Sequence, residues 1–180
     1  MVQEQRAKPK ALIPVELIEK RTWEIACEIE AAYTNPLSAL YIIGVLTGSF
    51  IFVSDLVRCL SIPLTITFIK ASSYEGLESS GSVAISGIEG LDIEGRDVLL
   101  VEDIVDTGLT LTKVIERLAQ YRPRTIKVCT LLDKPCKREY TVDVDYIGFE
   151  IPDKFVVGYG LDYKGIYRNL PYIGVMDGNV

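Results

Sequence analysis

The chain has 180 residues, a net charge of −6 and no histidine. A chain of this length can form one domain with a buried core that needs no disulfide or structural metal. The absence of histidine excludes Ser-His-Asp and Cys-His catalytic sets, and it excludes zinc sites that need imidazole. Any acid–base chemistry must therefore use carboxylates, Lys, Tyr or Cys. The acidic balance argues against binding to nucleic acid through bulk charge.

Hydrophobic residues make up 48% of the chain, and the mean hydropathy is +0.23. They come in runs far shorter than the ~20 residues that a membrane helix needs, so we expect no membrane contact. Such short runs predict strands buried on both faces, as in a parallel sheet. The polar start of the chain carries no secretion signal, and we expect a cytoplasmic protein.

The four cysteines show no C-x-x-C spacing, which argues against a zinc knuckle or a thioredoxin motif. Cys27, Cys59 and Cys129 lie in apolar periodic stretches and are expected in the core. Cys136 lies in a polar segment, where we expect a reduced thiol without a role.

The first half of the chain predicts a helix, then a strand, a tight glycine turn and a second helix. Apolar spacing of three and four residues marks the helices, and short apolar or alternating runs mark the strands. A Ser- and Gly-rich stretch without periodicity predicts a loop. In chain order the elements are helix 15–33, strand 40–46, turn 47–49, a helix from Val53 to Leu60, strand 64–70, loop 71–82 and the returning hairpin strand 83–85.

The second half continues the alternation of strands and helices. Its elements are strand 98–101 ending at Glu102 and Asp103, turn 104–108, a helix with Leu111, Val114, Ile115 and Leu118 on one face, and strands 126–132, 145–149, 155–159 and 172–176. This alternation predicts an α/β fold with a mostly parallel central sheet flanked by helices. Ligands of such sheets bind at the carboxyl ends of the strands, where both glycine turns lie.

The most informative segment is VLLVEDIVDTGLT, residues 98–110. The sequence Asp106-Thr107-Gly108-Leu109-Thr110 leads from a strand into a helix, whose N-terminus presents unpaired N–H groups and a positive dipole end. Gly108 lets the backbone approach a ligand, and the threonines add hydroxyl donors. Together these features predict a socket for one phosphate monoester.

Three carboxylates stand beside this socket: Glu102, Asp103 and Asp106. They suit a sugar phosphate, because they accept hydrogen bonds from a ribose diol and can hold a divalent cation. They also stabilise positive charge that develops on the sugar. Each acid alone would more often be an ordinary polar residue at a strand end, with a threonine as the helix cap. The whole sequence of acids, glycine and threonines favours the ligand site.

This segment resembles the phosphoribosyl pyrophosphate signature of the type I phosphoribosyltransferases. The resemblance continues at residues 44–50, which look like the pyrophosphate loop of the hypoxanthine-guanine branch, and at residues 148–163, which are similar to its purine-pocket signature. It covers residues 40–176. The family implies one domain over residues 1–180, with a core over about 35–150 and a small hood from about 1–34 and 151–180. It also implies a homodimer or homotetramer.

The resemblance implies purine salvage: transfer of the phosphoribosyl group to hypoxanthine or guanine with Mg²⁺ as cofactor, giving IMP or GMP and pyrophosphate. Asp106 would be the general base on the purine. The binding roles would fall to Glu102 and Asp103 (ribose and Mg²⁺), Asp106, Thr107, Gly108, Leu109 and Thr110 (5′-phosphate), Leu46, Thr47, Gly48 and Arg168 (pyrophosphate), Lys134, Phe155 and Val156 (purine), Asp162 (a second Mg²⁺ beside the purine), and Ser73 and Tyr74 (a mobile lid).

Residues of these types are also common without a functional role. Taken alone, Lys134 would be interpreted as a solvated surface charge, and Phe155 would be interpreted as a core residue. The chain departs from the family at Thr47, where a basic residue is frequent, and at Leu109, where Lys is frequent. Both positions are expected to contact ligand through the backbone, so the departures put affinity or subunit contacts in question rather than the reaction.

Two rival functions remain open from the sequence. The first is a regulatory homologue that senses phosphoribosyl pyrophosphate and binds nucleic acid, which the net charge of −6 argues against. The second is a sister enzyme that prefers xanthine, adenine or uracil; Lys134 favours a 6-oxo purine because its ammonium donates to an oxygen. A generic Rossmann nucleotide binder fails, since no G-x-G-x-x-G follows a strand.

Overall fold

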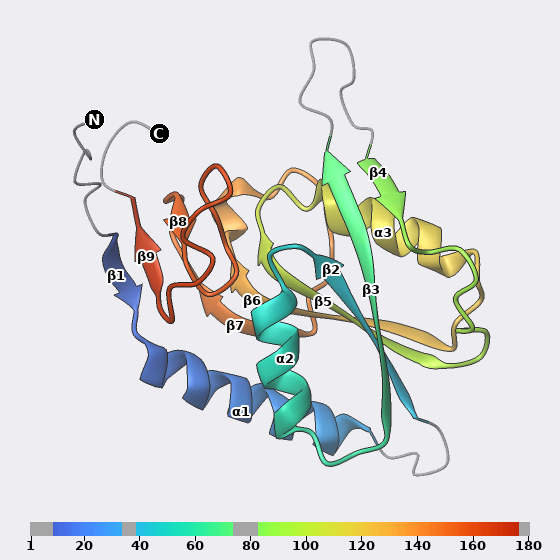
Figure 1. Ribbon diagram of the computed structural model, residues 1–180. Helices are drawn as coiled ribbons and strands as arrows, with labels where there is room; N and C mark the ends of the chain where they lie inside the picture. The colour runs from blue at the N-terminus through green and yellow to red at the C-terminus, as the bar shows by residue number, and fades with distance from the viewer. Residues whose placement is uncertain (1–8, 34–38, 74–82, 177–180) are drawn as a thin grey trace.

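The computed structural model describes residues 9–33, 39–73 and 83–176 (Figure 1). Within these ranges the chain forms a mixed α/β fold whose larger sheet has the strand order β4-β3-β2-β5-β6-β7. The elements of this part are β2 (Leu40–Leu46), α2 (Phe50–Cys59), β3 (Leu64–Ser73), β4 (Val83–Ser86), β5 (Asp97–Val105), α3 (Leu109–Ala119), β6 (Thr125–Asp133), the short 3-10 helix η1 (Pro135–Lys137) and β7 (Tyr146–Glu150).

The central strands run parallel, and β4 alone of the described strands in this sheet is antiparallel to its neighbour. Strand β2 pairs with β3 on one side and β5 on the other, with Ile43 opposite Thr67 and Leu100. Six of the seven residues of β2 are buried, because helices cover both faces. The apolar runs of the sequence therefore predicted these strands correctly.

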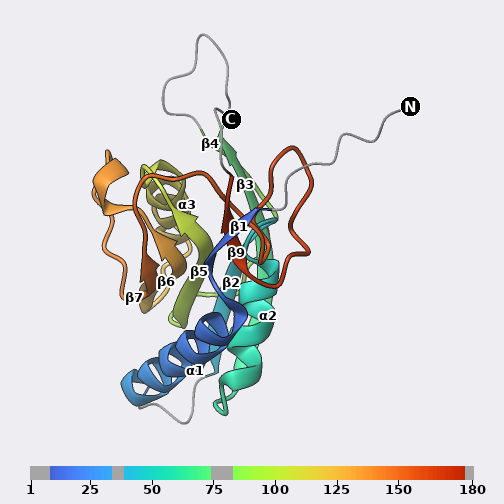
Figure 2. The ribbon, with the colours of Figure 1, turned by 90° about the vertical axis from the view of Figure 1, so that its left-hand side faces the viewer.

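Helices lie on both faces of the sheet (Figures 1 and 2). Helix α1 (Val15–Ala32) and helix α2 pack on one face, against alternate residues such as Ile42 and Leu99. Helix α3 packs on the other face, against Ile43 and Leu100. Side chains of consecutive strand residues point to opposite faces, so the two apolar clusters interleave along the same strands.

A second, smaller sheet joins segments from far apart in the sequence. Its strand order is β1-β9-β8, with β1 (Lys10–Ile13), β8 (Val156–Val157) and β9 (Ile173–Val175) all antiparallel to their neighbours. We predicted strands near 155–159 and 172–176; both are shorter than expected, and β1 was not predicted. Helix α1 lies within residues 1–34, which were expected to belong to the hood, but it packs on α2 and on β7 of the larger sheet.

Three local expectations were wrong. Strand β5 continues to Val105, so Glu102 and Asp103 lie inside the strand and residues 104 and 105 are not part of the turn. Strand β3 continues to Ser73, so the expected loop 71–82 begins later, and residues 74–82 lie outside the described residues. Cys27 is exposed, because the buried face of α1 is formed by Ile18, Ile25 and Ile29. None of the helices in the described ranges combines the length and apolar character that crossing a membrane requires.

Candidate active site

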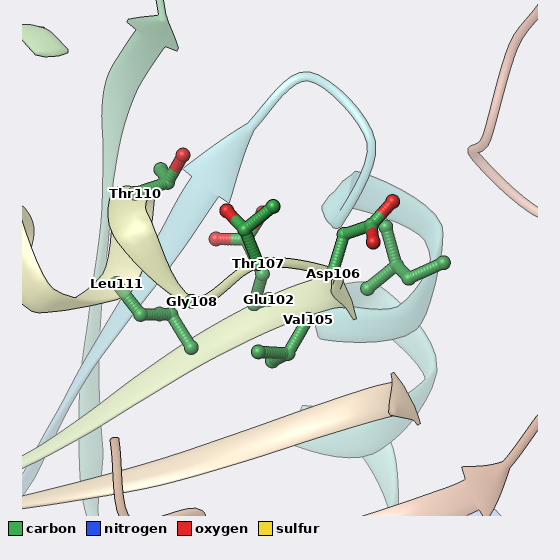
Figure 3. A pocket seen from close by; sticks show the side chains of 8 residues that line it. Glu102, Val105, Asp106, Thr107, Gly108, Thr110 and Leu111 are labelled. Carbon is green, nitrogen blue, oxygen red and sulfur yellow. The ribbon is translucent and has the colours of Figure 1, made fainter. Parts of the chain in front are cut away.

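The turn between β5 and α3 forms a hollow at the carboxyl end of β5 (Figure 3). Gly108 precedes the helix with a φ of 90°, and a side chain there would come within 2.6 Å of the carbonyl oxygen of Tyr140. A glycine is therefore required both by the left-handed backbone and by the close approach. The hollow is lined by Glu102, Ile104, Val105, Asp106, Thr107, Gly108, Thr110 and Leu111.

The polar and apolar side chains of this turn point to opposite sides. Figure 3 shows the oxygens of Asp106, Thr107 and Thr110 on the outer side, whereas Val105 and Leu111 point into the core, where they are buried. The N–H of Leu109, the first residue of α3, donates to Oγ1 of Thr107 at 3.3 Å, so the helix N-terminus lies beside the threonine hydroxyl. This arrangement can bind a phosphate through backbone donors, hydroxyls and the helix dipole.

Glu102 and Asp103 form an acidic pair on β5, and Glu102 lines the hollow. Burial raises the pKa of Glu102 well above its ordinary value, and the neighbouring Asp103 carboxylate raises it further. Burial also raises the pKa of Asp103, although hydrogen bonds from Glu102 and the backbone and the charge of Arg168 oppose this effect. One oxygen of Glu102, Oε2, is buried without a hydrogen-bond partner among the described residues. A pair of acids with one buried, unpaired oxygen suits a cation with oxygen ligands.

The glycine turn after β2 lies against this acidic pair. A methyl group on Gly48 would overlap the carboxylate of Asp103, so the backbone of this turn and the acids are in direct contact. The peptide bond between Leu46 and Thr47 is cis, and Ser49 Oγ donates to the carbonyl oxygen of Val45 at 2.6 Å. The Thr47 side chain is exposed, as expected for a residue that offers its backbone to a ligand.

The loop after β8 brings the guanidinium group of Arg168 close to the glycine turn. Arg168 donates through Nη1 to the carbonyl oxygen of Gly160 at 2.6 Å, and its Nη2 lies 2.6 Å from Oδ1 of Asp162. A side chain on Gly160 would overlap the carbonyl oxygen of Gly48, so this loop rests on the glycine turn. The structure thus brings Arg168 and Asp162 to the turn that the sequence assigned to pyrophosphate.

The third group of predicted residues consists of Lys134, Phe155 and Val156, of which Lys134 contacts Asp106. Lys134 is buried at the end of β6, with Nζ 3.4 Å from Oδ2 of Asp106. Phe155 keeps 43% of its surface exposed and contacts Tyr163 edge-on, with ring centroids 5.6 Å apart. Val156 is buried in β8. Lys134 is therefore not a solvated surface charge, and Phe155 is not a core residue.

Sequence reasoning missed two residues of this region. Lys137 lies 3.8 Å from Oδ1 of Asp106 and 3.2 Å from Oδ1 of Asp153, and Arg138 donates to the carbonyl oxygen of Asp106 at 3.3 Å. Both belong to the basic run that starts at Lys134, directly after a strand end, and that position could have indicated them. Of the predicted lid, Ser73 ends β3 and Tyr74 lies outside the described residues.

The predicted metal residues do not gather into one cluster. Within residues 9–33, 39–73 and 83–176, no group of three or more Asp, Glu, Cys or His side chains is placed to hold a metal ion. Glu102 and Asp103 are adjacent, whereas Asp162 is paired with Arg168 and accepts from the backbone N–H of Gly165 at 2.6 Å. A role for these three residues in metal binding stays a prediction.

Comparisons with known proteins show the family to which this chain belongs. Residues 17–164 match the phosphoribosyl transferase domain family. The hypoxanthine phosphoribosyltransferase of Salmonella typhimurium is 45% identical over 92% of this chain and 93% of its own length; the hypoxanthine-guanine phosphoribosyltransferase of Bacillus subtilis is 46% identical over 93% and 92%. The crystal structure of a hypoxanthine-guanine phosphoribosyltransferase from Bacillus anthracis superposes with a TM-score of 0.88, at 40% identity over 94% of this chain and 99% of that one. The chain therefore belongs to the phosphoribosyl transferase domain family.

Proposed function

We propose that this protein transfers the 5-phosphoribosyl group of phosphoribosyl pyrophosphate to hypoxanthine or guanine, giving IMP or GMP and pyrophosphate, in purine salvage. The observation that carries the proposal is the position of Asp106. This carboxylate lies between the phosphate turn and Lys134, whose Nζ is 3.4 Å away. The relatives named as hypoxanthine and hypoxanthine-guanine phosphoribosyltransferases support the same reaction.

The sugar phosphate would occupy the hollow between β5 and α3. Backbone N–H groups and hydroxyls from Asp106, Thr107, Gly108, Leu109 and Thr110 would bind the 5′-phosphate. Glu102 and Asp103 lie next to the hollow, where their oxygens accept hydrogen bonds from the ribose hydroxyls. The same negative charge stabilises the positive charge that develops on the sugar as its bond to pyrophosphate breaks.

The leaving group would lie along the glycine turn. Backbone groups of Leu46, Thr47 and Gly48 would bind pyrophosphate, and Arg168 would neutralise part of its charge. Glu102 and Asp103 would hold Mg²⁺, and Asp162 a second ion through waters; the buried free oxygen of Glu102 fits this assignment. The cation supplies charge neutralisation to the departing pyrophosphate.

The purine would lie between Phe155 and the end of β6. Lys134 would donate a hydrogen bond to the 6-oxygen, Phe155 would stack on the ring, and Val156 would contact its edge through the main chain. Asp106 would take the proton from the imidazole-ring nitrogen as that nitrogen forms its bond to the anomeric carbon. The bond from that carbon to pyrophosphate breaks, so no other reactant is needed.

A product assay tests the proposal. Purified protein, Mg²⁺ and phosphoribosyl pyrophosphate are incubated with hypoxanthine, guanine, xanthine or adenine, and nucleotides are separated by chromatography. We expect IMP and GMP, with adenine the poorest substrate because it has no oxygen for Lys134 to bind. The matched control is Asp106→Asn protein. If no base gives nucleotide although phosphoribosyl pyrophosphate binds, the enzyme reading is wrong and nucleic-acid binding becomes the next test.

We extend the proposal to the setting of the reaction. The family resemblance supports a cytoplasmic homodimer or homotetramer, and sedimentation of the purified protein measures that state. It also supports a lid that begins at Ser73 and Tyr74 and excludes water, so that the sugar cation meets the purine. Residues 1–180 would form one domain with a core over about 35–150 and a hood from the rest.

A further inference from the structure

A partly buried hydrogen bond joins the loop of Arg168 to helix α2. The hydroxyl of Tyr159 donates to Oδ2 of Asp55 at 2.6 Å, across more than half of the sequence. Tyr159 is 6% exposed and adopts a left-handed backbone with a φ of 51°, which is uncommon for an aromatic residue. Burial raises the pKa of its hydroxyl, and the Asp55 carboxylate raises it further, so the hydroxyl keeps its proton and donates.

Each partner of this bond lies on an element that also carries or contacts a residue assigned to pyrophosphate. Asp55 lies on α2, which begins directly after the Thr47-Gly48-Ser49 turn. Tyr159 is followed by Gly160, whose N–H donates to the carbonyl oxygen of Arg168 at 3.0 Å and whose own carbonyl oxygen accepts from Arg168 Nη1 at 2.6 Å. The bond therefore links the element that carries the turn to the loop that carries the cation.

The contact between these two parts leaves little room for movement. Gly160 is packed so closely on the carbonyl oxygen of Gly48 that a side chain would not fit. Tyr159 is further held by its own N–H, which donates to the carbonyl oxygen of Leu170 at 2.8 Å. A small rotation of the loop would change the distance between Arg168 and the turn, because Arg168 is bonded to Gly160 at two points.

We infer that Tyr159 is a positioning residue for pyrophosphate, which holds Arg168 at the Thr47-Gly48 turn through its hydrogen bond to Asp55. This inference rests on the proposed function. It assigns no contact with substrate to either Tyr159 or Asp55. Their effect is on the affinity for the diphosphate group and not on the purine.

The test compares Tyr159→Phe, which keeps the buried ring, with Asp55→Ala and with the double variant. A hydrogen bond to a charged group is worth about tenfold or more in an equilibrium, so we expect KM for phosphoribosyl pyrophosphate to rise about tenfold in each single variant. KM for hypoxanthine stays within about twofold. The double variant resembles the single variants, since both remove the same bond. Asp55→Asn, which keeps an acceptor oxygen, restores part of the affinity.

Tyr146→Phe is the matched control. Tyr146 is also a buried tyrosine, but its hydroxyl meets Lys127 at 3.4 Å, on strands away from the turn. We expect its substrate constants to equal those of the parent protein. If Tyr159 had a purely structural role, Tyr159→Phe and Asp55→Ala would both lower the melting temperature but leave KM for phosphoribosyl pyrophosphate unchanged. That result would overturn the inference. The Asp55 side chain is 31% exposed, so its variants keep the test available if Tyr159→Phe does not fold.

Failure of the proposed function is measured separately. If the parent protein makes no nucleotide, the same variants are titrated with Mg²⁺ and pyrophosphate by calorimetry. A pyrophosphate affinity about tenfold weaker in Tyr159→Phe than in Tyr146→Phe still supports the positioning role. Equal affinities, or no binding by the parent protein, overturn it.

Discussion

Gly48 lies directly against Asp103, so that a methyl group on its Cα would overlap the carboxylate oxygen Oδ2. Gly48 follows β2 and Asp103 lies within β5, and these two strands are neighbours in the parallel sheet. Their contact brings the turn assigned to the leaving group onto the acids assigned to the sugar. The bond that breaks in the proposed reaction joins these same two parts of the substrate.

We expect Gly48→Ala to lower kcat/KM by about 10²-fold, because the added methyl group displaces either the turn or the Asp103 carboxylate, and small displacements at a reacting centre are costly. Steady-state kinetics with varied phosphoribosyl pyrophosphate measure the effect. Gly90→Ala is the control: Gly90 has a φ of 80°, so alanine strains its backbone, but no atom lies within 4 Å of the added group. A Gly48→Ala enzyme with the kinetics of the control would contradict the packing argument.

Glu102 gives a prediction about pH. Its pKa is raised in the folded protein, chiefly by burial. The unfolded chain releases this proton near the ordinary Glu pKa of about 4.3, whereas the folded protein keeps it to higher pH. The folded state thus binds more protons, and its stability falls as pH rises through this window and levels off above the folded pKa.

We therefore expect Glu102→Gln to flatten this pH dependence and to raise the melting temperature of metal-free protein near neutral pH. Thermal melts with a chelator between about pH 5 and pH 8 provide the measurement. Glu89→Gln changes an exposed carboxylate and serves as control. Parallel curves for the parent protein and Glu102→Gln would refute the raised pKa of Glu102. The same variant should lose transferase activity, since it lacks the charge that holds Mg²⁺ and the ribose.

Asp106→Asn should lower turnover by about 10²-fold or more, the usual effect of losing a general base. The Asp106 side chain is 41% exposed, so the fold should be unaffected. Single-turnover kinetics and circular dichroism measure the two quantities. Near-parental turnover would remove Asp106 from the role of base.

Phe155→Ala should raise KM for hypoxanthine by about tenfold, because stacking of a base on an aromatic ring contributes about 1–3 kcal/mol. The ring is 43% exposed, so stability should change little. Trp23→Ala removes another exposed ring, on α1, and should leave the kinetics unchanged. If Phe155→Ala affects KM for phosphoribosyl pyrophosphate instead, the ring does not mark the base site.

Thr47→Lys should leave turnover within about tenfold of the parent protein, because the exposed side chain is not needed when the backbone binds the ligand. The comparison uses turnover at saturating substrates. A loss of several orders of magnitude would refute the backbone contact.

The sequence predicted the central sheet well because its strands are apolar on both faces and its helices have one apolar face. It could not predict strand β1, since four residues with little alternation carry no strong signal, and their pairing with Ile173–Val175 is decided by tertiary contacts. It also missed that Lys134 is buried, because the carboxylates that accompany it, Asp106 and Asp153, come from other segments. Side-chain environment of this kind depends on distant parts of the chain.

The smaller sheet has a consequence for how the molecule is made. The strands that carry the acids and the phosphate turn all precede Glu150, whereas Val156 depends on β9, and β1 pairs among the described strands only with β9. Because a chain leaves the ribosome from its N-terminus, the phosphate half of the site can fold first. The purine half must wait for Ile173–Val175, and until then strand β1 has no partner. A nascent chain can thus form the site for the 5′-phosphate and the ribose before Arg168, which is assigned to pyrophosphate, has been placed.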